Sequence, residues 1–64
     1  MKALPVSFAD QIACVTREIV QRRRVYARLV ARGSMTQAKA DLEIRHMEAV
    51  LETVEKAATA ERLI

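Results

Sequence analysis

The sequence has 64 residues, with 11 Lys and Arg against 8 Asp and Glu, a formal net charge of +3 and 52% hydrophobic residues. A chain this short forms at most one small domain, and its mixture of apolar residues with charges of both signs argues against intrinsic disorder. One cysteine and one histidine exclude an intrachain disulfide and a four-ligand structural zinc site. We therefore expect residues 1–64 to form a single all-α domain that gains further stability by oligomerisation.

The amino-terminal residues Met1–Pro5 carry one charge and start no apolar run of the kind found in signal peptides. No other stretch approaches the roughly 20 apolar residues of a transmembrane helix. The sequence therefore predicts a cytoplasmic protein with no membrane association.

The first predicted helix covers about residues 7–32. Ser7 and Asp10 resemble a capping box, because the Ser7 hydroxyl can accept a hydrogen bond from the backbone N–H of Asp10. No proline or glycine interrupts the chain from there to Arg32. Residues at alternating spacings of four and three form a heptad seam. Its members are Phe8, Ile12, Val15, Ile19, Arg22, Tyr26 and Leu29.

The predicted turn, residues 33–35, begins at the only glycine of the chain. Gly33 fits the left-handed conformation that commonly ends a helix. The second helix is predicted at about 36–60, with either Ser34 or Thr36 as its cap. Ser34 with Gln37 makes the better capping box, whereas a cap at Thr36 leaves Met35 to cover the turn. A second seam follows at Ala40, Ile44, Met47, Leu51, Val54 and Ala58.

The shortness of this turn predicts an antiparallel two-helix hairpin that resembles a coiled coil. The two seams agree in length and phase, which brings Leu29 next to Ala40 and Ile12 next to Ala58. A second, mostly small-residue stripe lies beside the seam of the first helix. One partner helix cannot cover it, so we expect it to be the interface of a homodimeric four-helix bundle, although alanines are also simply good helix formers. This predicted interface consists of Ala9, Ala13, Val20, Ala27 and Ala31.

Charge is distributed unequally between the two predicted helices. The first is net positive and the second net negative. Arg17, Arg24 and Arg28 align opposite the hydrophobic seam and are predicted to face solvent. The favoured interpretation is a solvated face that a protein partner can contact, and the alternative is a nucleic-acid surface. No helix-turn-helix or basic-zipper pattern is present, and aromatic residues are too few for stacking on single strands.

Arg22 occupies a seam position where an apolar residue is expected. We expect its stem to lie along Met47 while the guanidinium reaches water or an acid such as Glu18 or Glu48. The alternative is that it fixes register and partner choice. Tyr26 is expected to be a core aromatic residue with its hydroxyl at the edge.

The sequence shows no glycine-rich phosphate loop and no nucleophile with a base at a workable spacing. His46 is expected to be a surface side chain, and Cys14 a small helix residue without an activating histidine. We therefore predict a protein that is not an enzyme, with no catalytic residues, cofactor or metal.

Several segments resemble small uncharacterised proteins encoded by bacteriophages and prophages of proteobacteria. This resemblance covers about residues 10–55, and the segment around the turn is its most specific part. It implies a phage-derived gene in a bacterial cytoplasm, but no activity or functional residues. The segments are Gln11-Ile12-Ala13-Cys14-Val15, Arg17-Glu18-Ile19, Arg22-Arg23-Arg24-Val25-Tyr26, Gly33-Ser34-Met35-Thr36-Gln37-Ala38-Lys39-Ala40-Asp41, Glu43-Ile44 and Met47-Glu48-Ala49-Val50-Leu51.

Overall fold

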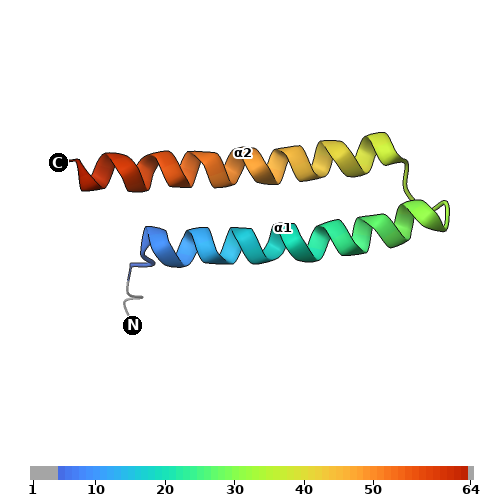
Figure 1. Ribbon diagram of the computed structural model, residues 1–64, viewed down its shortest axis with the longest axis horizontal. Coiled ribbons are helices and arrows are strands. Elements are labelled where there is room, and N and C mark those ends of the chain that lie inside the picture. The colour runs from blue at the N-terminus through green and yellow to red at the C-terminus, as the bar shows by residue number, and fades with distance from the viewer. Residues whose placement is uncertain (1–4, 64) are drawn as a thin grey trace.

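Two antiparallel helices make up the fold in the computed structural model, which describes residues 5–63 (Figure 1). Helix α1 covers Phe8–Ala31 and helix α2 covers Gln37–Arg62. The two helices pack against each other, and no strand occurs in the described part of the chain. The prediction of an all-α helical hairpin is therefore confirmed.

Helix α1 begins as its capping residues predict. The Ser7 hydroxyl accepts a hydrogen bond from the backbone N–H of Asp10 at 3.1 Å, and the carboxylate of Asp10 lies in the positively polarised first turn. The Gln11 side-chain amide also donates to the Val6 carbonyl at 3.0 Å. The entry of the chain into α1 is thus fixed by local hydrogen bonds.

The end of α1 forms a Schellman motif. The backbone N–H of Ser34 donates to the Leu29 carbonyl at 2.8 Å, and that of Gly33 donates to Val30 at 3.1 Å. Gly33 has φ = 77°, the left-handed conformation that glycine adopts at low cost. The predicted role of Gly33 is confirmed.

Thr36 caps helix α2. Its hydroxyl accepts from the backbone N–H of Lys39 at 3.1 Å, while Ser34 is used by the Schellman motif of α1. Met35, between them, is half-buried over the turn. Helix α2 starts at Gln37 and continues to Arg62, which is two residues beyond the predicted end.

The core of the hairpin lies along the two predicted seams. Ile19, Ala40 and Ile44 are buried, and every other seam residue of either helix is half-buried. Tyr26 borders the same depression as Ala40 and Ile44, and Phe8 and Ile12 border another with Ala58. The helices are therefore in the predicted register, with the heptad positions facing each other.

The hairpin is a single layer of helices. The molecule measures 47 × 30 × 15 Å, and its radius of gyration of 15.2 Å exceeds the roughly 11 Å of a compact domain of this length. Domains usually bury their cores between two layers of secondary structure. Both broad faces of this layer are therefore open.

Within residues 5–63, neither helix contains a stretch that is long and apolar enough to cross a bilayer.

Candidate interaction surface

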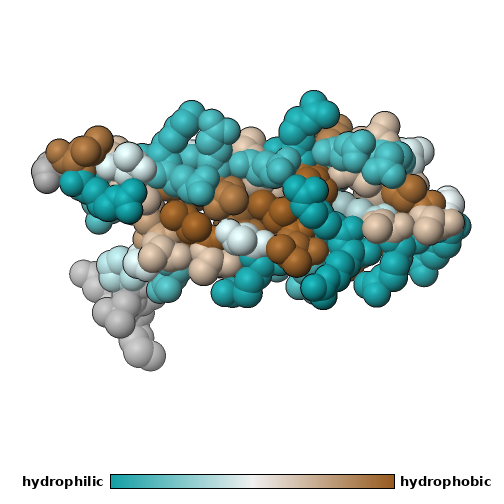
Figure 2. Space-filling view, in the orientation of Figure 1, coloured by the Kyte–Doolittle hydropathy of each residue, from teal (hydrophilic) through white to brown (hydrophobic). Residues whose placement is uncertain are grey.

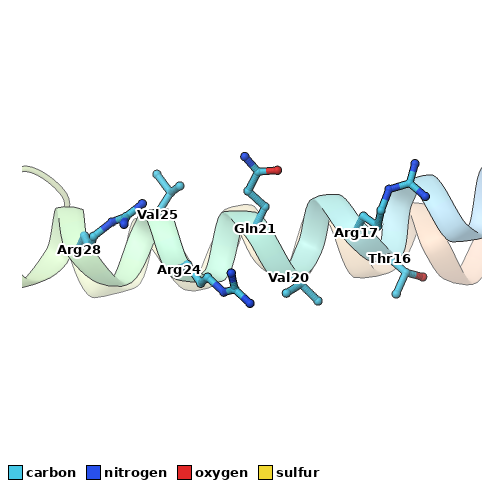
Figure 3. A pocket seen from close by; sticks show the side chains of 7 residues that line it. All are labelled: Thr16, Arg17, Val20, Gln21, Arg24, Val25 and Arg28. Carbon is cyan, nitrogen blue, oxygen red and sulfur yellow. The ribbon is translucent and has the colours of Figure 1, made fainter.

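The three arginines of the predicted partner surface lie together on the outer side of α1, away from α2 (Figure 3). Arg17, Arg24 and Arg28 are all exposed, and none of them forms an ion pair with another described residue. They border one shallow depression. Its remaining lining residues are Thr16, Val20, Gln21 and Val25.

This depression has walls from one helix only, so no second element encloses a ligand in it (Figure 3). Sites for small molecules are usually concave and cover most of the ligand surface. An extended surface is a better match, because Arg17 and Arg24 repeat at about 10 Å along the helix axis. Guanidinium groups in such a row suit carboxylates or phosphates on another macromolecule.

The small-residue stripe of α1 is uncovered in the single chain. Ala9, Ala13, Val20, Ala27 and Ala31 are all exposed, and 49% of the Val20 surface is accessible. In Figure 3 Val20 and Val25 point to opposite edges of the outer side of α1. The stripe therefore runs along one edge of this side, next to the arginines.

The stripe borders one of the two broad faces of the hairpin. On this face Arg23 of α1 pairs with Glu48 of α2, with 3.0 Å between Arg23 Nη2 and Glu48 Oε2. We call this the Arg23–Glu48 face. Ala27 and Asp41 line a depression with Arg23 at the turn end. Ala9 lines another with Arg62 at the open end. The α1 side of this face is thus rich in small residues, and the α2 side is mostly charged.

One broad face of the hairpin is visible in Figure 2. Apolar side chains follow the line between the helices, and hydrophilic side chains cover most of α2. Apolar surface is also exposed elsewhere on α2, since Leu42 and Val50 are 44% and 48% accessible. Exposed apolar side chains thus occur on both helices.

Arg22 extends its guanidinium to the opposite broad face. Its Nε lies 3.5 Å from Glu18 Oε2, one helical turn away, and the residue is half-buried. The Tyr26 hydroxyl and then the Glu18 carboxylate raise the pKa of the Arg22 guanidinium above its ordinary value. Of the two predicted acidic partners, Glu18 is observed, because Glu48 pairs with Arg23 instead.

Two further ion pairs form within α2, each between residues one helical turn apart. Lys39 Nζ lies 3.0 Å from Glu43 Oε1, and Lys56 Nζ lies 2.9 Å from Glu52 Oε1. A hydrogen bond from the lysine lowers the pKa of each of these carboxyl groups. Three of these four side chains are exposed and Glu43 is half-buried, so each pair contributes only modestly to helix stability.

The remaining reactive side chains lie apart from one another. Cys14 is exposed as a free thiol on α1, and His46 is exposed on α2. No group of three or more His, Cys, Asp or Glu side chains among residues 5–63 is arranged to hold a metal ion. Chemical groups of these kinds therefore do not converge in the described hairpin.

Sequence reasoning did not identify the Arg23–Glu48 pair. Both residues flank the seams on the same side, so the predicted register contained the signal once the helices were aligned. Searches of protein-family models, curated proteins and solved structures find no match to this chain. Its resemblance to phage and prophage proteins therefore stays a prediction.

Proposed function

We propose that this chain is a non-enzymatic protein-interaction module that self-associates, most simply into a homodimeric four-helix bundle. In this proposal it is a phage- or prophage-derived protein that acts in a bacterial cytoplasm. The dimer presents the charged outer sides of its helices to a protein partner. The stripe of small residues, Ala9 to Ala31, lies between the two copies.

The main support is the amount of surface that the single hairpin leaves open. All five residues of the stripe are exposed, and 49% of the Val20 surface is accessible. On α2, Leu42 and Val50 are 44% and 48% accessible. Exposed apolar surface of this kind is typical of a protein–protein interface.

The small core of the hairpin also supports self-association. Only three of the described residues are buried, Ile19, Ala40 and Ile44, although the seams extend along most of both helices. Small domains with so little burial usually need association, a metal or disulfides for stability. Association is the source that fits this chain, because its single cysteine excludes an intrachain disulfide.

Light scattering on a concentration series from about 5 to 500 µM tests self-association. We expect a mass of twice the 7.2 kDa chain at the upper concentrations, with dissociation on dilution. The Val20→Glu variant should shift the mass to that of one chain, because it buries a charge in the interface. Ala38→Glu, which adds the same charge at an exposed position in the first turn of α2, is the matched control. A mass of 7.2 kDa throughout contradicts the proposal.

A second function is favoured by one observation, the absence of acidic partners for Arg17, Arg24 and Arg28 among the described residues. Unpaired guanidinium groups in a row suit the phosphates of a nucleic-acid duplex. In a dimer, two such rows would form a longer basic surface.

Fluorescence anisotropy with a labelled 20-base-pair duplex distinguishes this alternative. It predicts binding at about 50 mM salt that weakens steeply by 200 mM, and a loss of roughly tenfold in affinity for Arg24→Glu. Arg45→Glu has the same net charge but changes α2, so it should bind more tightly than Arg24→Glu. No binding at 50 mM salt eliminates the alternative.

A further inference from the structure

We propose that a second copy of this chain covers the Arg23–Glu48 face in one specific orientation, with α1 of each copy against α2 of the other. The two-fold axis then runs parallel to the helices, between the two layers. This inference rests on the proposed self-association and adds the identity of the face, the pairing of the helices and the residues in contact.

The choice of face follows from where small residues and acids lie together. On this face α1 presents Ala9 and Ala27, with Val20 between them along the same stripe. Small side chains let a second helix approach closely. Helix α2 contributes Asp41 and Glu48 to the same face. One broad face thus combines an apolar contact surface with charges that can select its partner.

The choice of helix pairing follows from the net charges. From Val6 to Gly33 the chain has six arginines and two acids, a net charge of +4, whereas from Met35 onward it has six acids and four bases, a net charge of −2. An axis perpendicular to the helices, in the plane of the layers, would stack α1 on α1 and α2 on α2. Like charges would then face each other along both contacts. The parallel axis places each basic helix on an acidic one and avoids this repulsion.

The register of the hairpin predicts which residues meet. Both helices rise about 1.5 Å per residue away from the turn, so Ile19 lies level with Leu51. A two-fold axis parallel to the helices keeps these levels in the second copy. Val20 of one copy then comes level with the segment 48–52 of the other, where Glu48 lies on this face and Glu52, one helical turn further along α2, is exposed.

In this register, charged residues on the outer side of α1, next to the stripe, come level with opposite charges on α2. Arg17 of one copy comes level with Glu52 and Glu55 of the other, and Asp10 comes level with Arg62. Arg24 lies level with both Glu48 and Arg45, which carry opposite charges. Its charge therefore does not distinguish the two orientations of the dimer. Arg17 is therefore the residue whose charge tests the orientation most directly.

Disulfide trapping separates the two helix pairings. In a Cys14→Ala background, the single variants Val20→Cys and Glu52→Cys are mixed in urea, refolded together and oxidised with a mild thiol-disulfide buffer. We expect the mixed disulfide between the two variants to form at least tenfold faster than either homodisulfide, since bridging requires Cα atoms within about 7 Å.

Each other outcome of the trapping experiment is decisive. A dominant Val20→Cys homodisulfide shows α1 packed on α1, and overturns this inference while leaving self-association intact. A dimeric mass with only a statistical mixture of disulfides also overturns it, because another face is then covered. A monomer by light scattering overturns both the inference and the proposed function.

Charge reversal gives a second measurement that does not depend on disulfide geometry. Arg17→Glu should weaken dimerisation by about tenfold, because the two-fold axis repeats the altered pair. Adding Glu52→Arg to the same chain should restore most of the affinity. Arg32→Glu, with the same net charge as Arg17→Glu but at the C-terminal cap of α1, beyond the last residue of the stripe, is the control. If the double variant dimerises no better than Arg17→Glu alone, the proposed contact is wrong.

Discussion

Arg23 donates to Glu48 across the hairpin at 3.0 Å, yet both side chains are more than half exposed, at 55% and 52%. Exposed ion pairs of this kind contribute at most about 1 kcal/mol, because water screens the charges and two long side chains lose freedom. The pair therefore identifies the register and the face of the hairpin, and the seams supply its stability.

A double-mutant cycle on this pair should show that small contribution. We expect Arg23→Gln, Glu48→Gln and the double variant to give a coupling energy below about 1 kcal/mol in urea unfolding, at one fixed protein concentration. The coupling should shrink further in 1 M NaCl. A coupling of several kcal/mol that salt does not change would show that the pair is desolvated, as in a buried interface.

Truncation of the core should be far more costly. Ile44 is only 8% exposed, and Ile44→Ala removes buried methyl and methylene groups, so we expect a loss of about 2 to 4 kcal/mol in the free energy of unfolding. Val50→Ala, at a position that is 48% exposed, should cost less than about 1 kcal/mol. Urea unfolding followed by circular dichroism at 222 nm measures both, and equal losses would place Val50 in a covered surface.

The cap of α2 can be tested by a matched pair of substitutions. Thr36→Ala removes the acceptor for the Lys39 N–H and should lower stability by about 1 kcal/mol. Ser34→Ala should have almost no effect, because Ser34 contributes its backbone N–H rather than its hydroxyl to the turn. Thermal unfolding of the two variants compares these effects directly, and a larger loss for Ser34→Ala would contradict the assigned cap.

These caps also show how far local sequence signals reach. The seams, the Ser7 cap and the left-handed Gly33 were predictable, since each depends on residues within one or two turns. Local signals left the choice between Ser34 and Thr36 open, because Ser34 makes the better capping box with Gln37 whereas Thr36 leaves Met35 to cover the turn. The choice is made by the Schellman motif, which binds the Ser34 N–H to Leu29 and leaves Thr36 as the first residue free to start α2.

Features that depend on contacts between helices were less accessible from the sequence. Arg23 is the middle residue of the run Arg22-Arg23-Arg24, and its pairing with Glu48 emerges only when the two helices are aligned. Helix α2 extends two residues beyond its predicted end. No glycine or proline stops the helix there, so Glu61 and Arg62 continue it. The exposed stripe was found from the helical period alone, whereas its partner is a property of another molecule.

The ion pairs along α2 predict a fall in stability in acid. The pKa values of Glu43 and Glu52 are lowered from the ordinary 4.5 by hydrogen bonds from Lys39 and Lys56. A carboxyl group with a lowered folded pKa stabilises the fold above the unfolded pKa, and this contribution disappears as the pH falls through the folded value. The thermal midpoint should therefore decrease below about pH 4.5.

The variant Glu43→Gln with Glu52→Gln isolates this contribution. Because it lacks both titrating groups, its thermal midpoint should fall less than that of the unmodified chain between pH 7 and pH 2.5. On the alkaline side, the pKa of Lys56 is raised by Glu52, so that pair persists until the pH exceeds 10.5. Parallel acid curves for the two proteins would show that other carboxyl groups control the transition.

Substitutions at Arg22, near the centre of the α1 seam, test whether this residue only packs its stem on the seam or also selects the register of the helices. Arg22 is half-buried and its guanidinium reaches Glu18, so Arg22→Met should keep the apolar contact of the aliphatic stem and lose only a weak, exposed ion pair. We expect Arg22→Met to leave the free energy of unfolding unchanged or slightly higher. Arg22→Ala should lower it, since the contact of the aliphatic stem is also lost.

The mass of the Arg22→Met variant by light scattering decides between the two roles predicted for this residue. If Arg22 only extends to solvent, the variant should have the same mass as the unmodified chain at every concentration. A polar residue that fixes register destabilises alternative registers and oligomers. Its replacement by an apolar residue would remove that penalty and allow the alternative oligomers to form. A larger mass, or a mixture of masses, for Arg22→Met would therefore assign to Arg22 the selection of the oligomer, at some cost in stability.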